Sequence, residues 1–209
     1  VPGVGARYLA RNDSRVVGIL GPGVMARTSL SAFMATCPKI DTLKVKGRGE
    51  KSLADFVSWV RTTFPQITTI RTVDTIEDVA RDSDIVTFCQ SGAIGDPSQY
   101  PMVRREWIKP GTFLSMPSLT DVDEGMQAPD IRKVLDNPAM YEAGYDECEK
   151  PAHRSVPVVG MRYLDLVAEG RVERDSLEDL GKIVAGEAVG RTSDDEIIKI
   201  RTKVAKNAG

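Results

Sequence analysis

The stretch GILGPGVMAR, residues 18–27, follows two apolar residues, Val16 and Val17, and precedes a segment with helical spacing. Glycine at positions 21 and 23 and alanine at 26 form a G-x-G-x-x-A pattern between a strand expected at residues 16–20 and a helix expected at residues 24–36. By itself the pattern describes either a tight corner or a dinucleotide-binding turn. The sequence that follows it decides between the two.

The composition is typical of one globular domain. The 209 residues are 41% hydrophobic and 28% charged, with a net charge of −2. This balance argues against disorder and against a nucleic-acid or membrane surface. No apolar run is long enough to cross a bilayer, and the first residues lack the parts of a signal peptide, so we expect a cytoplasmic protein without nucleic-acid or membrane partners.

The cysteines and the histidine do not indicate a metal site or a catalytic triad. Cys37, Cys89 and Cys148 are far apart and odd in number, which favours reduced thiols over a disulfide framework. With His153 as the single histidine, zinc would need all four side chains to converge without a C-x-x-C pair, and a Ser-His-Asp triad would lack its G-x-S-x-G turn. We expect no metal.

Strand and helix patterns alternate along most of the chain. Strands are expected at residues 16–20, 42–46, 67–70, 84–89, 112–116, 140–145 and 196–200, and helices at residues 4–10, 24–36, 52–64, 76–80, 158–169 and 177–185. This alternation predicts an α/β fold, a doubly wound and mostly parallel sheet of the Rossmann type with helices on both faces.

In such a sheet the first strand-to-helix turn lies at the carboxyl edge, where ligands bind. Gly21 would allow the turn, Gly23 would let a pyrophosphate approach the backbone, and Ala26 would let helix and strand pack closely. The first helical N–H groups, at Val24 and Met25, would face the phosphates with the positive end of the helix dipole. The context therefore favours the dinucleotide-binding turn.

The segment KVKGRGEK, residues 44–51, bears on the choice of dinucleotide. Where an acid would bind the ribose 2′-hydroxyl of NAD, this chain has Gly47, followed by Arg48 and preceded by Lys46. Arginine and lysine suit a 2′-phosphate, so the pattern favours NADP, with NAD possible. The alternative is a solvated basic loop, whose charge Glu50 partly offsets.

Several motifs in order resemble the cofactor domain of the ornithine cyclodeaminase/mu-crystallin family. They are ARYLARNDS (6–14), VGILGPGVMA (17–26), DSDIVTFCQSG (82–92), WIKPGTFLSM (107–116) and LEDLGKIVAGEAVGRTSDDEI (177–197). The resemblance implies NAD(P)-dependent hydride transfer at the α carbon of a small amino acid or its imine.

The resemblance also assigns site residues. In SMPSLTDVDEG, residues 115–125, Asp121 matches the family's acid-base aspartate, although without the resemblance a solvated acidic loop or a helix cap would be favoured. After the strand at 84–89, a triplet would line the dinucleotide cleft, and a pair at the end of the next strand would lie near the nicotinamide. These residues are Gln90, Ser91, Gly92, Ser115 and Pro117.

The resemblance leaves two other functions possible, and it implies that the whole protein has a second domain. One alternative is a mu-crystallin-like protein that binds NADPH and a small ligand without turnover, and another is an NAD-dependent ornithine or lysine cyclodeaminase. We expect residues 1–209 to form a cofactor domain excised from a two-domain enzyme. The absent domain would supply substrate ligands and form a homodimer.

Overall fold

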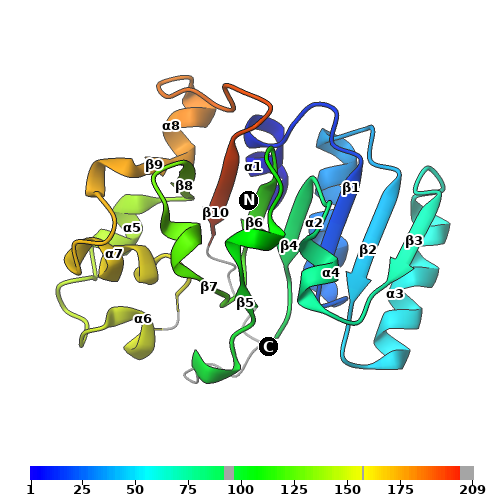
Figure 1. Cartoon of the computed structure of the whole chain (residues 1–209), viewed down its shortest axis with the longest axis horizontal. Helices are drawn as coiled ribbons and strands as arrows, with labels where there is room; N and C mark the ends of the chain where they lie inside the picture. Colours follow the sequence, from blue (N-terminus) through cyan, green and yellow to red (C-terminus); the bar gives the residue numbers. More distant parts are fainter. Residues whose placement is uncertain (92–96, 157, 203–209) are drawn as a thin grey trace.

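A computed structural model describes residues 1–91, 97–156 and 158–202, and it confirms the doubly wound α/β fold. Eight strands form one sheet in the order β3-β2-β1-β4-β6-β10-β8-β9, and every neighbouring pair is parallel (Figure 1). A separate parallel pair, β5 with β7, lies outside this sheet.

The elements have the following bounds. The strands are β1 (Val16–Leu20), β2 (Thr42–Lys46), β3 (Thr69–Thr72), β4 (Ile85–Phe88), β5 (Met102–Val103), β6 (Phe113–Met116), β7 (Asp121–Val122), β8 (Ile131–Leu135), β9 (Leu177–Asp179) and β10 (Ile197–Arg201). The α-helices are α1 (Pro2–Leu9), α2 (Val24–Thr36), α3 (Glu50–Thr63), α4 (Ile76–Ala80), α5 (Pro138–Glu142), α6 (Ala152–Ser155), α7 (Met161–Ala168) and α8 (Leu180–Ala185). The short 3-10 turns η2 (Arg105–Trp107) and η3 (Glu124–Gln127) pack beside the sheet.

Strand β1 lies inside the sheet because its side chains are apolar on both faces, as in parallel sheets covered by helices. Gly18 lets α4 pack directly on this strand, since a Cβ there would lie 2.1 Å from the carbonyl oxygen of Val79. Helix α4 begins with a capping box in which the Thr75 hydroxyl accepts the Asp78 N–H, and Asp78 accepts the Thr75 N–H.

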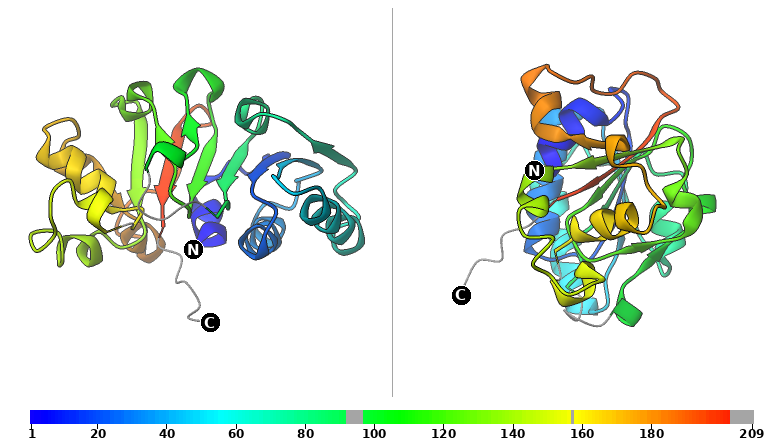
Figure 2. Two further views of the ribbon diagram at one scale, coloured as in Figure 1. Left: turned by 90° about the horizontal axis from the view of Figure 1, so that it is seen from below. Right: turned by 90° about the vertical axis from the view of Figure 1, so that its left-hand side faces the viewer.

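Helices cover both faces of the sheet. One core cluster joins α1, α2, α3 and α8 to one face, and a second joins α4, η2 and η3 to the other (Figure 2). A third cluster packs α5, α6 and α7 against the end formed by β8 and β9. The carboxyl ends of the strands are left as the edge where loops from different strands meet.

The structure corrects the expected strand at residues 140–145, which is wrong because residues 140–142 belong to helix α5 and residues 143–145 form a turn. The helix begins where the Asn137 side chain accepts the Met140 N–H, and Pro138 occupies its first turn. Strand β8 was not predicted. Residues 177–179, expected to be helical, form strand β9 before α8 begins.

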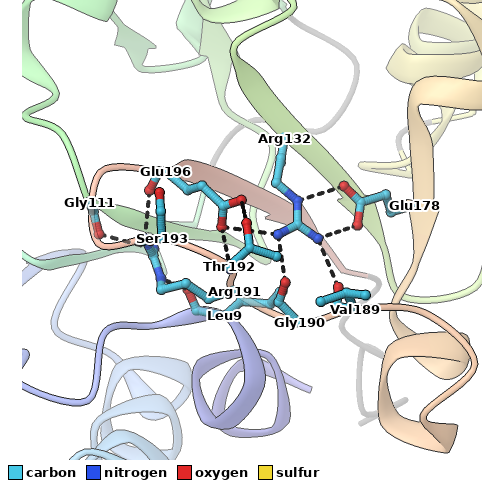
Figure 3. Close-up of polar contacts among 10 residues, drawn as sticks. All are labelled: Leu9, Gly111, Arg132, Glu178, Val189, Gly190, Arg191, Thr192, Ser193 and Glu196. Atoms are coloured by element: carbon cyan, nitrogen blue, oxygen red, sulfur yellow. Dashed lines mark hydrogen bonds and ion pairs between the residues drawn. The ribbon is translucent and has the colours of Figure 1, made fainter.

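Two arginines hold the segment before β10 against its neighbours (Figure 3). Arg132 on β8 pairs with Glu178 on β9 and with Glu196, and it donates to the carbonyl of Gly190 at 2.7 Å. Arg191 donates to the carbonyl of Leu9, among other backbone oxygens. These contacts fix the path by which the chain enters β10.

Candidate active site

A cleft of about 420 Å³ lies at the carboxyl ends of β1, β2 and β4. At β1 the strand order reverses, since β2 lies on one side and β4 on the other. The carboxyl edge at such a reversal is the usual ligand position in open α/β sheets. The structure brings six of the expected residues to this cleft, namely Gly21, Gly23, Lys46, Arg48, Gln90 and Ser91.

Gly21 makes the turn after β1 possible. Its φ is +91°, and a Cβ there would lie 2.5 Å from the Cα of Gln90, so no other residue fits without strain. Its N–H donates to the carbonyl of Lys46 at 2.9 Å, which joins the turn to the end of β2. The turn is therefore held between the two neighbouring strands.

Gly23 leaves open space where a side chain would be, because nothing lies within 4 Å of its Cβ position. It is the N-cap of α2, and no side chain caps this helix. The helical ladder begins when the Arg27 N–H donates to the Gly23 carbonyl, so the N–H groups of residues 24–26 precede it. An uncapped helix start beside an open cleft can bind an anion.

The side chains of the first turn of α2 do not line the cleft. Val24 is 79% exposed, Met25 is half-buried, and Ala26 is fully buried in the core against the sheet. At these positions a ligand would therefore meet the backbone rather than the side chains.

The opposite wall of the cleft is basic. Arg48 donates to the Ser91 carbonyl at 3.1 Å, which links the loop after β2 to the loop after β4. The Lys46 ammonium donates to the carbonyl of Asp74. Among the lining residues that the structure describes there is no carboxylate, so the two cations face the cleft without an acidic partner in its wall.

Gln90 separates the cleft from a second hollow. Its amide donates to the Leu119 carbonyl at 3.0 Å and to the Thr120 hydroxyl at 3.2 Å. Its own Oε1 is buried and accepts no hydrogen bond from the described residues, so it remains available as an acceptor. Gly92, expected beside it, lies outside the described residues.

Ser115 and Pro117 do not line the cleft, although β6 pairs directly with β4. Both residues are buried, and the Ser115 hydroxyl has no partner within the described ranges. They lie one strand further along the same edge.

Asp121 lies in the second hollow, which has a volume of about 10 Å³. Strand β7 holds it through an N–H that donates to the Pro101 carbonyl at 2.9 Å. The side chains of His153, Arg162 and Arg201 line the same hollow. Sequence reasoning assigned none of these three a role. The one signal for Arg201 was its position directly after the strand expected at residues 196–200, at the edge of the sheet where ligands bind.

A buried carboxylate orients the histidine of this hollow. Asp165 accepts the ring Nδ1 of His153 at 2.6 Å, the N–H groups of Ala152 and His153, and the Tyr145 hydroxyl at 3.0 Å. Burial works to raise the pKa of Asp165, but these hydrogen bonds outweigh it, and the pKa lies below its usual value. The charged carboxylate therefore fixes the imidazole.

The model of the ornithine cyclodeaminase/mu-crystallin family matches residues 1–200. The chain belongs to this family. The match confirms the resemblance carried by the motifs on either side of β1, β4 and β6.

Relatives within the family resemble nearly all of this chain. The chain is 24% identical over 196 residues to an N-((2S)-2-amino-2-carboxyethyl)-L-glutamate dehydrogenase of Staphylococcus aureus, over 93% of this chain and 52% of the relative. It is 27% identical to an alanine dehydrogenase of Archaeoglobus fulgidus, over 93% of this chain and 53% of that protein. The chain thus spans about half the length of the curated relatives it matches.

The fold is shared with a solved structure of the Δ1-pyrroline-2-carboxylate reductase of Thermococcus litoralis, which holds NADH and L-proline. The TM-score is 0.74 at 24% identity, over 97% of this chain and 57% of the other.

The described residues were also searched for membrane-spanning helices and for clusters of metal-binding side chains. They contain no helix long and apolar enough to span a bilayer. In the same ranges, no group of three or more histidine, cysteine or acidic side chains lies together as metal ligands would.

Proposed function

We propose that this chain binds a nicotinamide dinucleotide, NADP in preference to NAD, in the cleft at the end of β1. The observation that carries the proposal is the turn from Gly21 to the uncapped start of α2, set opposite two cations. The open space at Gly23 would let a cofactor approach the backbone. The buried Oε1 of Gln90 could accept a hydrogen bond from the cofactor, whereas in a merely structural corner it would stay without a donor.

Different residues would bind different parts of the cofactor. Gly21, Gly23 and the first N–H groups of α2 would hold the pyrophosphate, and Arg48 with Lys46 would hold a ribose 2′-phosphate. Gln90 and Ser91 line the way toward β6, where Ser115 and Pro117 would lie near the nicotinamide. When bound, this group supplies or accepts a hydride.

We further propose that the chain is the cofactor domain of a longer two-domain oxidoreductase that acts at the α carbon of an amino acid or its imine. Asp121 would exchange a proton with the substrate nitrogen. The length of the relatives, about twice that of this chain, supports the longer protein. A homodimer would form through the second domain.

Titration of NADPH and NADH into the wild type and Arg48→Ala, followed by nicotinamide fluorescence, tests the cofactor assignment. We expect the wild type to bind NADPH at least about tenfold more tightly, and Arg48→Ala to remove this preference, because a charge-assisted pair with the phosphate is lost. Arg71→Ala, an exposed change of the same charge on β3, is the control. Equal affinity for both cofactors in the wild type and the variant would contradict the assignment.

Asp121→Asn in the full protein tests the chemistry. We expect kcat for NADPH oxidation with cyclic imino acids to fall by about 10²-fold or more, with cofactor affinity unchanged, because the proton donor is lost. Glu124→Gln, an exposed acid nearby, is the control. Ammonia release without net cofactor change would instead indicate a cyclodeaminase, and tight binding without turnover a binding protein.

A further inference from the structure

Arg201, at the end of β10, is a buried cation that forms no ion pair with any residue the structure describes. It is 2% exposed, its Nη2 donates to the Thr120 carbonyl at 3.1 Å, and its guanidinium lies 5.3 Å from the ring centre of Tyr163. Its Nε is buried and donates to no atom of the described residues. Within the same ranges no carboxylate forms an ion pair with it, not even Asp121 in the same hollow.

Arg132 on β8 differs from Arg201 in this respect. Arg132, although more exposed, pairs with both Glu178 and Glu196. A buried charge normally has a partner, because removing a charge from water costs several kcal/mol unless an opposite charge compensates, as a rough general figure. Arg201 therefore has capacity for an anion that the described part of the protein does not use.

Two buried lysines lie on β8 and β10 near Arg201. Lys133 and Lys199 are both buried and donate to backbone carbonyls or to an amide oxygen, and neither pairs with a carboxylate in the parts described. Burial, and then the charges of Arg201 and Lys133, lower the pKa of Lys199 well below its usual value. Arg201 and Lys199 thus repel each other, with Asp123 as a partly compensating acid near Lys199.

A small hollow lies beside Arg201. Arg201 lines the hollow beside Asp121, and Arg162 and His153 line its other sides. Its volume of about 10 Å³ suits a group of about the size of one water or one carboxylate oxygen. The Thr120 carbonyl accepts a hydrogen bond from Arg201, and the Thr120 hydroxyl accepts one from the amide of Gln90. Gln90 in turn lines the cofactor cleft.

We propose that Arg201 is the base of an anion subsite that holds a carboxylate of the substrate beside Asp121. Arg162, which also pairs with Glu169, and His153, oriented by Asp165, line the same hollow. A guanidinium suits a carboxylate oxygen, because it stays charged when buried and directs its N–H groups from one rigid plane. Naming the anion as a substrate carboxylate rests on the proposed function.

A purely structural role for Arg201 makes a different prediction. As a clamp between the Thr120 and Val159 carbonyls, it would affect stability but would not distinguish a carboxylate from an amide on a ligand. The comparison of acid and amide ligands therefore separates the two roles.

Calorimetric titration of the full protein with L-glutamate, L-glutamine and L-isoglutamine tests the subsite, since each amide replaces one carboxylate. We expect one amide to bind at least about tenfold more weakly than glutamate, the loss of one charge-assisted pair. We expect Arg201→Gln to bind glutamate no more tightly than the wild type binds that amide. Arg162→Gln should weaken glutamate binding less than Arg201→Gln does. Arg174→Gln, on the exposed pair with Glu142, should match the wild type.

Three results would overturn the subsite. They are equal affinity of the wild type for glutamate and both amides, no binding of any of the three, and an unchanged preference in Arg201→Gln. The wild-type series decides without any variant, and circular dichroism checks that Arg201→Gln is folded. Because the titrations involve no turnover, loss of NADPH binding or of hydride transfer would count against the proposed function alone, and cofactor affinity should be unchanged in Arg201→Gln.

Discussion

At the scale of single residues, two glycines close together in the chain serve different purposes. The fold itself requires Gly21, because its φ is positive and its Cα lies against the backbone of Gln90. Gly23 has an ordinary extended backbone and empty space at its Cβ position. Its lack of a side chain therefore matters to a ligand more than to the fold.

Alanine substitutions should separate these purposes. We expect Gly21→Ala to lower the free energy of unfolding by at least about 1–3 kcal/mol, because of backbone strain. Gly23→Ala should lower it by less than about 1 kcal/mol, yet reduce NADPH affinity at least about tenfold. Urea unfolding and nicotinamide fluorescence measure the two effects, with Gly144→Ala as a control that also has open space. Full NADPH affinity in Gly23→Ala would contradict this assignment.

The site residues that directly follow strands could be predicted from the sequence. Those that only tertiary packing places at the site could not. Gly21, Arg48 and Gln90 could be placed together because parallel strands end at one edge. His153 lies far along the chain from Asp121, and only the folding of α6 beside β7 brings it to the hollow. Arg201 directly follows the strand expected at residues 196–200, but its contacts with Thr120 and Val159 could not be predicted from the sequence.

At the scale of elements, segments with a clear apolar or capping pattern were predicted well, and segments with a mixed pattern were not. The bounds of β1, β2 and α2 agree with the expectation residue by residue. Strand β8 has two charged residues among five, so its pattern did not stand out. For α5 the signal was present as Asn137 followed by Pro138, a typical helix start, but the apolar residues after it were interpreted as a strand.

The ion pairs of Arg132 connect β8, β9 and the segment before β10, so their loss should affect the whole sheet end. We expect Arg132→Ala to lower the free energy of unfolding by about 2–4 kcal/mol, because two half-buried glutamates lose their partner. Arg81→Ala, which breaks an exposed pair with Glu77, should cost less than about 1 kcal/mol. Urea unfolding compares the two, and equal losses would show that the Arg132 contacts add little.

At the scale of the whole molecule, Asp84 joins the starts of three strands. Its carboxylate accepts the N–H groups of Arg15 and Val16 before and at the start of β1, and it pairs with Lys109 before β6 at 2.7 Å. Burial works to raise the pKa of Asp84, but Lys109 and the two N–H groups outweigh it, so the pKa lies below 3.8. The folded protein therefore favours the charged carboxylate.

This lowered pKa predicts how stability depends on pH. The contribution of Asp84 is complete above 3.8 and is lost as the pH falls through the lower pKa of the folded state. Asp84→Asn should lower the free energy of unfolding by about 1–3 kcal/mol at pH 7, and the difference from the wild type should shrink below 3.8. Asp146→Asn, at an exposed position, is the control. A difference that stays constant in acid would contradict the prediction.

The place of β10 has a consequence for how the molecule can be assembled. This strand follows β8 and β9 in the chain but lies between β6 and β8, and it is the link through which those two strands join the rest of the sheet. During synthesis, the first five sheet strands can pair with one another, while β8 and β9 can pair only with each other until β10 has been made. Stopping the ribosome before Ile197 would leave two unjoined pieces, each exposing a bare edge to other chains.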